Sequence, residues 1–343
     1  PLVLGATVLS HLFGASVGRE GTAVQMGGAL ADQFTHVFKL GREDRRIVLM
    51  AGISAGFASI FGTPLAGTIF GLEVLAIGRL RYDAIFPCMI AAIVANQVTL
   101  LWGVHHVRDI VAFIPPPSAW LMLSMMIGGV AFGLAGKMFA DTSHALSAWM
   151  KRRLPYAPLR PLVGGIVLAC FVWFLHADRY IGLGIPTISL AFHQPIAPYD
   201  FAGKMVSTIL SLGTGFKGGE VTPLFFIGAA LGNALAPLLN APIPLLAGVG
   251  FVAVFAGAAN TPIACTLMAM ELFGSEIGLY AAIACVASYL FSGHTSIYHA
   301  QRVGQAKVRP TPEGIRLKDL HAHRQTHGQP PLAPSTSNEE KTF

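Results

Sequence analysis

The chain has 343 residues, of which 53% are hydrophobic and only 12% are charged. Soluble domains carry about a quarter charged residues, so the composition excludes an ordinary soluble protein and predicts one that lies in a membrane. The formal net charge is +6, but the excess sits in short hydrophilic stretches between apolar runs. It therefore reports membrane topology and argues against a nucleic-acid partner.

Apolar runs follow one another along the whole chain, and we predict that they are helices. The runs are 1–17, 22–38, 46–61, 64–78, 84–104, 119–140, 159–176, 202–214, 222–239, 244–258, 261–273 and 277–292. Several are shorter than the roughly 20 residues that a straight helix needs to cross a bilayer. Short runs that end in Gly or Pro predict half-helices and re-entrant segments, which a membrane tolerates only inside protein or beside a polar cavity. We therefore expect an all-α, polytopic membrane protein with broken, re-entrant helices.

The chain divides into a first transmembrane half, 1–110, and a second half, 119–300. A stiff linker from Arg108 to Ser118, which contains three consecutive prolines, separates them. Two loops are rich in lysine and arginine, and by the positive-inside rule we expect both to face the cytoplasm. Their basic residues are Lys39, Arg42, Arg45 and Arg46 in one loop and Lys151, Arg152, Arg153 and Arg160 in the other.

Residues 303–343 change character and are mostly polar, which predicts a soluble, partly disordered cytoplasmic tail. Three histidines in this tail, at 321, 323 and 327, have a spacing that would bind a metal weakly, and a solvated tail without a metal is the favoured interpretation. The four cysteines lie inside apolar runs at wide spacings, so they predict neither a disulfide framework nor a metal centre. We expect no cofactor.

Two glycine-flanked acids repeat at a separation of 200 positions. Glu20 lies in the stretch Gly18–Thr22, and Glu220 lies in the matching stretch Gly218–Thr222. A second pair of motifs begins with Thr-Pro and leads to Glu73 in one copy and to Glu271, 198 positions later, in the other. This pattern is typical of a duplicated transporter with broken helices at its ion site. Such halves are often inverted, but the sequence by itself leaves open whether these two are inverted or parallel.

Glu20 is predicted to begin a helix, where free N–H groups and the helix dipole favour an anion. A mobile anion is favoured at the same place, so the carboxylate and the anion compete for it. Protonation of the carboxyl group would release it and admit the anion, which is the physical basis of proton-linked anion transport. The alternative is a carboxylate that only caps its helix, although an ionisable group inside a membrane segment is usually functional.

Glu220 repeats this geometry at the predicted start of the second helix, near Val221. An acid repels an anionic substrate, so either Glu220 is protonated or it accepts hydrogen bonds while neighbouring amides bind the ion. Thr222 adds a hydroxyl donor. Tyr298 follows the last apolar run, where a phenol donates to an anion or anchors the helix end at the membrane surface. Glu73 and Glu271 are interpreted as structural acids that bond to neighbouring backbone.

The stretch Gly18–Gly21, followed by Val24, Gln25, Gly27 and Gly28, resembles the gating motif of the CLC family of chloride channels and anion/proton antiporters. The second motif is Gly-x-Phe-x-Pro in most members of that family. Here it reads Gly219 to Pro223 with Glu and Thr ahead of the proline, which resembles the fluoride-exporting branch. The resemblance covers about residues 1–300 and implies the CLC fold of inverted repeats and a homodimer with one pathway in each subunit.

Carried over by resemblance, Glu20 is the gating glutamate that also carries the proton, and the amides of Arg19 and Gly21 flank the outer anion position. The central anion position is surrounded by the amides of Glu220 and Val221 and the hydroxyls of Thr222 and Tyr298. In fluoride-type members the acid at the place of Glu220 and the nearby threonine take part in fluoride handling.

Three departures from the family pattern matter. Thr22 stands where the gating motif usually has proline. The family's first selectivity loop should precede Glu20 and has no match there, so we expect that helices ahead of Pro1 are missing from the given chain. The stretch Gly182–Pro186 fits the sequence pattern of that loop but precedes the second motif, and we assign it no ion contact.

Chloride-type antiporters also carry an internal proton-transfer glutamate. The nearest stretch here, 105–107, has no acid. Protons would therefore need another route, such as Glu220.

The leading hypothesis is therefore a fluoride/proton antiporter that exports fluoride across the cytoplasmic membrane of a bacterium. A chloride channel or chloride/proton exchanger of the same fold is the alternative. A membrane enzyme or sensor is a third possibility, but an enzyme needs a clustered nucleophile and base or metal ligands. No apolar run carries such a cluster, so we do not expect an enzyme.

Overall fold

The computed structural model describes residues 1–104, 106, 111, 113–298, 300–305, 307, 314–317 and 319. Residues 108–110 and 112 of the predicted linker and all three tail histidines lie outside this part of the chain. The described residues form thirteen α-helices: α1 (Leu2–Leu12), α2 (Glu20–Val37), α3 (Arg42–Phe61), α4 (Pro64–Glu73), α5 (Ile85–Leu101), α6 (Ala119–Arg153), α7 (Leu159–Leu175), α8 (Ile185–His193), α9 (Asp200–Thr214), α10 (Val221–Leu235), α11 (Ile243–Ala259), α12 (Pro262–Phe273) and α13 (Gly278–Phe291). Two short strands, β1 (Ala76–Ile77) and β2 (Arg302–Val303), pair in parallel.

The helices follow the apolar runs closely, with two exceptions. The nine-residue helix α8 falls between two predicted runs, because it is too short for its apolar residues to stand out from the flanking loop. Helix α6 continues to Arg153 and has 35 residues, well beyond the predicted end at 140.

The prediction that the basic residues lie in loops was wrong for most of them, although Lys39 does lie in the turn between α2 and α3. Arg42, Arg45 and Arg46 lie in the first turns of α3, and Lys151 to Arg153 form the last turn of α6. Lysine and arginine have good helix propensity, so a helix continues through them once it has begun. At the end of α6 their charge also complements the helix dipole.

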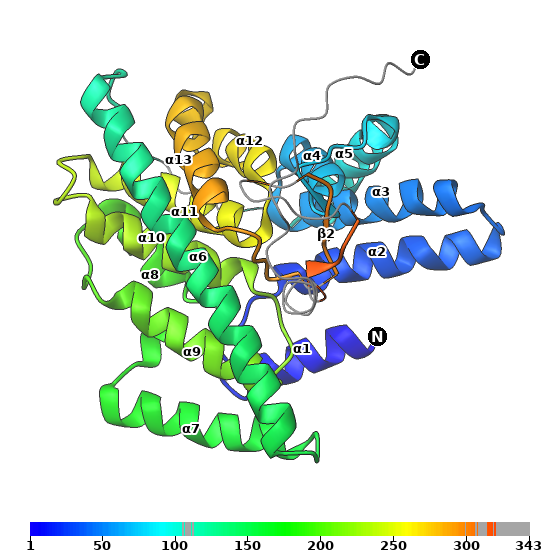
Figure 1. Ribbon diagram of the computed structural model, residues 1–343, viewed down its shortest axis with the longest axis horizontal. Helices are drawn as coiled ribbons and strands as arrows, with labels where there is room; N and C mark the ends of the chain where they lie inside the picture. Colours follow the sequence, from blue (N-terminus) through cyan, green and yellow to red (C-terminus); the bar gives the residue numbers. More distant parts are fainter. Residues whose placement is uncertain are drawn as a thin grey trace, which may run out of the picture.

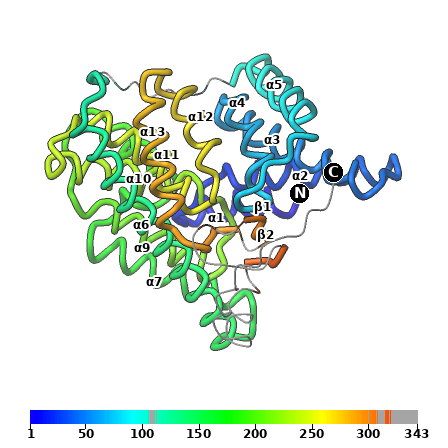
Figure 2. Tube along the Cα trace, turned by 45° about the horizontal axis from the view of Figure 1, so that its top comes forward, coloured from blue at the N-terminus to red at the C-terminus, as the bar shows by residue number. Residues whose placement is uncertain are grey.

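Figures 1 and 2 show α1 to α5 gathered on one side of the molecule and α6 to α11 on the other, with α12 and α13 between them. Helix α4 of the first half packs against α12 of the second half. Helices α10 and α11 form the centre of the second group, and nearly all of their residues are buried. Their backbones approach closely where Gly228 meets Gly250, since a Cβ atom on Gly228 would overlap the carbonyl oxygen of Gly250. Small residues at such crossings are typical of membrane helices.

Two glutamates tie α4 and α12 together in a reciprocal way. The Glu73 carboxylate, at the end of α4, accepts hydrogen bonds from the first amides of α12, those of Ile263 at 3.2 Å and Ala264 at 3.0 Å. The Glu271 carboxylate, near the end of α12, accepts from Leu65 at 3.0 Å and from the following residue at 2.8 Å. The structural role expected of both acids is confirmed.

The reciprocal arrangement of Glu73 and Glu271 requires α4 and α12 to be antiparallel, because each helix presents its carboxyl end to the amino end of the other. Two copies that exchange identical contacts are related by a local two-fold axis. Such an exchange between antiparallel helices is what inverted repeats produce, and a parallel duplication does not produce it.

The membrane character of the fold is visible in its helices. Two helical segments, Tyr82–Leu101 and Ala119–Arg153, are long and apolar enough to cross a bilayer, and several shorter apolar helices accompany them among the described residues. Only 17% of the apolar window in Tyr82–Leu101 is buried inside the chain. An apolar helix so exposed requires lipid or another protein surface around it.

The segment after α13 returns to the first half. Its strand β2 pairs with β1, in the register Ala76 with Arg302 and Ile77 with Val303. The side chains of Ile77 and Val303 are fully buried together with Leu317. The chain from 300 to 305 is therefore part of the folded body, although we predicted that the polar tail begins at 303.

Candidate functional site

The two glycine-acid motifs meet in the structure. Gly18 and Gly219 form an isolated antiparallel bridge, in which each N–H donates to the other residue's carbonyl oxygen at 2.7 Å. The glycines permit this approach, because a Cβ atom on Gly219 would lie 2.6 Å from the amide nitrogen of Gly21. A Cβ on Gly21 would in turn lie 3.0 Å from the Cα atom of Gly219. The structure thus brings together the two motifs that the sequence separates by 200 residues.

The bridge places the amino ends of two helices side by side. Helix α2 begins at Glu20, two residues after Gly18, and α10 begins at Val221, two residues after Gly219. Neither helix has a side-chain hydrogen bond at its N-cap residue. The N-cap side chains thus leave the first turns of both helices uncapped, and two positive dipole ends converge on one place. This arrangement favours an anion.

Glu20 folds back on the start of its own helix. Its side chain is buried, and Oε2 accepts a hydrogen bond from the backbone N–H of Arg19 at 3.0 Å. The Arg19 guanidinium lies 3.9 Å from Oε1 but is largely exposed to solvent. The carboxylate thus occupies the anion-favouring end of α2, as its sequence position predicts, and it is held by one amide and one distant cation.

Glu220 lies across the bridge from Glu20. It is the N-cap residue of α10, and its Oε2 is 3.7 Å from the position that a Cβ atom on Gly21 would take. The acid of the second half therefore sits against the backbone of the first-half motif. Within the described residues no hydrogen bond to another residue fixes the Glu220 carboxylate, and the residue as a whole is partly exposed.

Thr222 supplies a hydroxyl group that has no partner. Its side chain is buried in the first turn of α10, and Oγ1 makes no hydrogen bond to any described residue. The same oxygen lies 3.1 Å from the position that a Cβ atom on Gly18 would take, so it faces the bridge. A buried hydroxyl without a partner costs free energy, and a bound anion beside Gly18 would accept its hydrogen bond.

Tyr298 reaches the same region from the segment after α13. The backbone there is fixed because the amide of Ile297 donates to the carbonyl of Ala258 at 3.0 Å and the amide of Tyr298 donates to Ser296 Oγ at 3.0 Å. The phenol packs against the central hydrophobic core, and the Glu220 carboxylate is one of the charges that act on it electrostatically. The structure thus brings Tyr298 toward the second motif.

The first motif is also anchored to its surroundings through residues that the motif analysis did not select. Thr22, which stands where the family has proline, shares a hydrogen bond of 2.8 Å with Thr7 of α1. Ser16 bonds to α9 twice, since its amide donates to Ser211 Oγ at 2.9 Å and its hydroxyl pairs with Thr208 at 2.9 Å. These contacts hold the turn between α1 and α2 against the second half.

Lys204 is a charged residue near the site that the sequence analysis missed. It lies on α9 with no exposed surface and donates to the backbone carbonyls of Tyr180 at 3.0 Å and Gly182 at 2.7 Å. The lysine thereby holds the loop Gly182–Gly184 ahead of α8, and the amide of Gly182 donates to the carbonyl of Ala15, beside the first motif, at 3.1 Å. An ionisable residue inside the apolar run 202–214 was the signal that would have found it.

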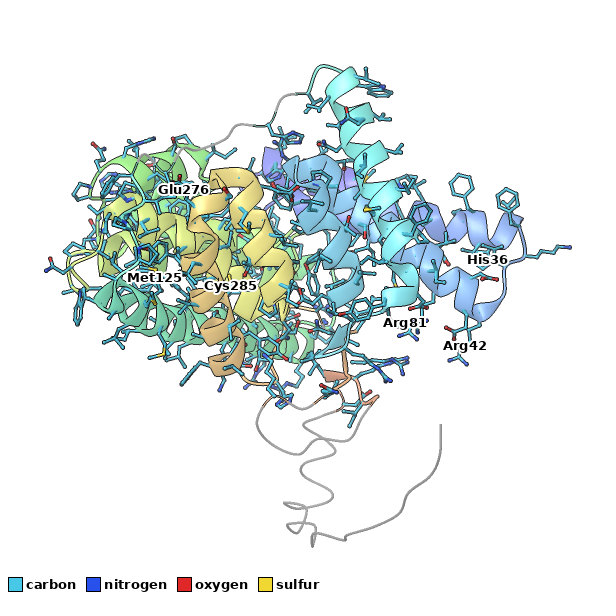
Figure 3. All side chains as sticks on the ribbon, turned by 90° about the horizontal axis from the view of Figure 1, so that it is seen from above. His36, Arg42, Arg81, Met125, Glu276 and Cys285 are labelled. Carbon is cyan, nitrogen blue, oxygen red and sulfur yellow. The ribbon has the colours of Figure 1, made fainter. Side chains whose placement is uncertain are left out.

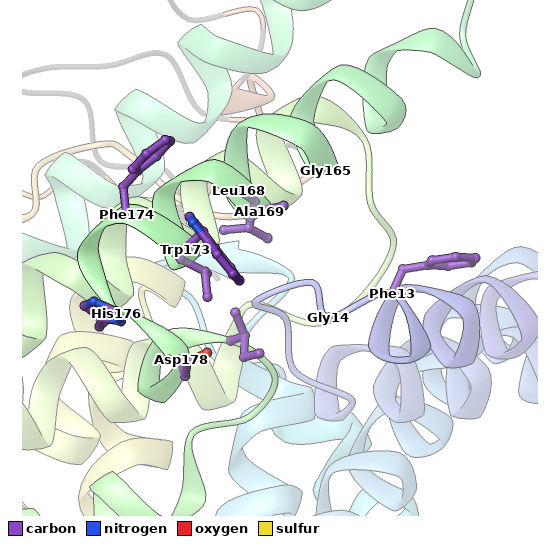
Figure 4. A pocket seen from close by; sticks show the side chains of 11 residues that line it. Phe13, Gly14, Gly165, Leu168, Ala169, Trp173, Phe174, His176 and Asp178 are labelled. Carbon is purple, nitrogen blue, oxygen red and sulfur yellow. The ribbon is translucent and has the colours of Figure 1, made fainter.

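A sizeable cavity lies away from this site. It measures about 650 Å³, lies beside α7, and is lined in part by Phe13, Gly14, Trp173, His176 and Asp178 (Figure 4). None of the predicted site residues lines it, and its walls are mainly apolar. We assign the anion site to the paired helix ends and not to this cavity. Among the described residues no group of three or more His, Cys, Asp or Glu side chains is placed to hold a metal ion.

A mostly helical body of two reciprocal halves, in which short helices end where the halves meet, defines a class of secondary transporter with broken helices. The family described as voltage-gated chloride channel matches residues 1–293. The chain belongs to this family, the CLC family of ion transporters.

Individual relatives agree with this assignment. A protein of Pseudomonas syringae pv. tomato named chloride/fluoride channel protein is 64% identical over 336 residues, which cover 96% of this chain and 74% of that protein. The H(+)/Cl(-) exchange transporter ClcA of Vibrio cholerae is 30% identical over 279 residues, or 76% of this chain and 58% of that one. The crystal structure of a CLC-type fluoride/proton antiporter superposes with a TM-score of 0.85 at 38% identity, covering 88% of this chain and 77% of the other.

Proposed function

We propose that this chain is a fluoride/proton antiporter that exports fluoride across the cytoplasmic membrane of a bacterium. The observation that carries the proposal is the bridge between Gly18 and Gly219, which joins two open helix ends and puts one acid beside each. The similarity to a CLC-type fluoride/proton antiporter and to a chloride/fluoride channel protein supports fluoride as the ion.

In the proposed cycle the ionised Glu20 carboxylate and the anion exclude each other. While ionised, Glu20 accepts the Arg19 amide and occupies the end of α2. When Glu20 takes up a proton, its negative charge disappears and its hold on that amide weakens, because hydrogen bonds to charged acceptors are about twice as strong as those to neutral ones. The anion then enters beside the amides of Arg19 and Gly21, and ionisation of Glu20 expels it again.

The second motif is proposed to hold the ion in the central position. The amides at the start of α10, at Glu220 and Val221, and the hydroxyls of Thr222 and Tyr298 are the proposed donors there. Fluoride is small and a strong hydrogen-bond acceptor, so hydroxyl and amide donors at close quarters suit it. The Glu220 carboxyl group, which lies against the backbone of Gly21, is proposed to pass the proton onward or to share it with fluoride.

The proposed setting is a homodimer in the lipid bilayer, with one pathway in each subunit. The exposure of Tyr82–Leu101, of whose apolar window 17% is buried, supports an apolar environment around α5. We assign no enzymatic reaction and no cofactor to the protein.

The test is ion flux from proteoliposomes, measured for fluoride with an ion-selective electrode and for protons with a pH electrode. A fluoride gradient should drive protons against their own gradient, and chloride should do so much less effectively. Equal flux of chloride and fluoride would contradict the fluoride assignment. Fluoride flux that moves no protons would indicate a channel in place of an antiporter.

A further inference from the structure

A second cavity lies at the end of the first half that we expect to face the cytoplasm. It measures about 440 Å³ and is formed by the start of α3, the second residue after α4 and strand β2. Four arginines line it: Arg42, Arg45, Arg46 and Arg302. The other lining residues are Glu43, Leu49 and Leu75. We name this cavity the arginine pocket.

The positive charge of the arginine pocket is largely uncompensated. Arg45 is paired with Asp32, through hydrogen bonds of 2.8 and 3.1 Å. Within the described part of the chain, Arg42, Arg46 and Arg302 form no ion pair or side-chain hydrogen bond. Each of these three guanidinium groups therefore has its donors free.

Among the described residues, the nearby acids form no ion pair with Arg42, Arg46 or Arg302. Glu43 is bonded to Arg81 at 3.1 Å, and Asp83 is bonded to the same guanidinium. Asp44 is exposed and forms no ion pair with a described residue. Arg42, Arg46 and Arg302 thus line the pocket without an ion pair of their own, while Glu43, which also lines it, is bonded to Arg81.

The start of α3 carries charges of both signs. Arg42, Arg45 and Arg46 oppose the helix dipole there, whereas Glu43 and Asp44 in the first turn complement it. The N-cap residue, Gly41, supplies no side-chain hydrogen bond to the free amides. An anion in the pocket would relieve both the repulsion between the arginines and their conflict with the dipole.

The surroundings identify the anion as part of a membrane lipid. Leu49 and Leu75 give the pocket an apolar wall. The end of α2 next to this helix start exposes Phe34, Val37 and Phe38 by 58%, 74% and 68%. Figure 3 shows Arg42 and Arg81 at the same end of the α2–α3 pair. Apolar side chains that border a cluster of basic groups at the end of membrane helices match a lipid with an anionic head group.

We propose that the arginine pocket binds the phosphate of an anionic phospholipid, with Arg42, Arg46 and Arg302 as donors and the acyl chains along the apolar end of α2. Arginine suits this role because its planar fork binds phosphate with two hydrogen bonds. The lipid would link α3 to β2. Since β2 begins four residues after Tyr298, an occupied pocket steadies the segment that carries the proposed ion donor.

The test is native mass spectrometry of the purified full chain, titrated with phosphatidylglycerol or with zwitterionic phosphatidylcholine. We expect one phosphatidylglycerol to be retained per subunit with clear preference over phosphatidylcholine. The double variant Arg46→Gln/Arg302→Gln should weaken binding about 25-fold, since each basic residue near an anionic surface contributes about 1 kcal/mol, or about fivefold. The matched control is Arg152→Gln/Arg153→Gln, which removes the same charge from the end of α6 and should leave binding unchanged.

The outcomes are distinct. Equal loss of lipid binding in both double variants would mean that net charge alone attracts the lipid. That result would contradict the proposal that the arginine pocket is the binding site. If millimolar inorganic phosphate displaces the lipid, the pocket binds a soluble phosphate and the lipid assignment is wrong. If the protein shows no preference between the two lipids, the lipid assignment is also wrong. The measurement reports occupancy without any transport, so it stands independently of the proposed fluoride exchange.

Discussion

Gly18 and Gly219 exchange two backbone hydrogen bonds of 2.7 Å, although they are separated by most of the chain. The pair is symmetric, because each residue both donates to and accepts from the other. It joins the entry turns of α2 and α10 as Glu73 and Glu271 join α4 and α12. The two halves thus meet through like elements at the place where both helices expose free amides.

Replacement of Glu20 by glutamine should abolish proton coupling. The amide keeps the size of the side chain but carries no negative charge and no titrating proton. Fluoride flux should continue or rise, while fluoride-driven proton movement falls to background in proteoliposomes. Proton pumping at the unmodified rate in this variant would remove Glu20 from its proposed role.

Glu220→Ala should impair fluoride movement more than it lowers the yield of folded protein. The carboxyl group lies beside Gly21 and has no hydrogen bond to another described residue that the fold would lose. The measurement compares flux per folded protein with the monodisperse fraction in size-exclusion chromatography, and Glu220→Gln separates loss of charge from loss of size. Ordinary flux in both variants would leave Glu220 with a structural role only.

Thr222→Val removes a hydroxyl group that no described residue uses as a partner. Because no internal hydrogen bond is lost, the stability should be unchanged or slightly higher. If the hydroxyl donates to the ion, the preference for fluoride over chloride should fall by about two- to tenfold, which corresponds to 0.5–1.5 kcal/mol for one hydrogen bond. Selectivity is measured from the reversal of flux in mixed gradients. Unchanged selectivity would show that the Thr222 hydroxyl does not select the ion.

Gly219→Ala should disrupt the site through backbone overlap. A methyl group there would lie 2.6 Å from the Gly21 nitrogen, and backbone cannot move aside as a flexible side chain does. We expect transport to be lost and thermal stability to fall. Gly5→Ala is the matched control, since a methyl group at that helical glycine has no neighbour within 4 Å and alanine favours the helix. Equal behaviour of the two variants would show that the close approach is unimportant.

Glu73→Ala should lower the melting temperature in detergent by several degrees. Two amides at the start of α12 lose their acceptor, and a buried group left unpaired costs about 1–3 kcal/mol. Ion selectivity of the protein that remains folded should not change, because Glu73 does not contact the paired motifs in the structure. Glu271→Ala should behave alike, and a selectivity change in either variant would place these acids in the ion pathway.

The sequence alone determined the helical character of the chain and most of its helix positions. Long apolar runs leave the backbone no partners other than its own, so each run becomes a helix. It also identified the repeated acids, because Glu20 and Glu220 stand beside glycines at matching places. Helix α8 escaped the prediction because nine residues carry too little periodic signal, and the arginines of α3 were mistaken for a loop because charge was given more weight than helix propensity.

Only the tertiary structure decided what these segments do to one another. The contact of Gly18 with Gly219, the exchange of amides between Glu73 and Glu271, and the burial of Lys204 all depend on pairs that lie far apart in the chain. Local sequence records what each helix prefers, whereas the inversion that brings two helix amino ends together arises from packing between halves. Since an anion responds to the sum of the amides and charges around it, that site exists only after the halves have packed.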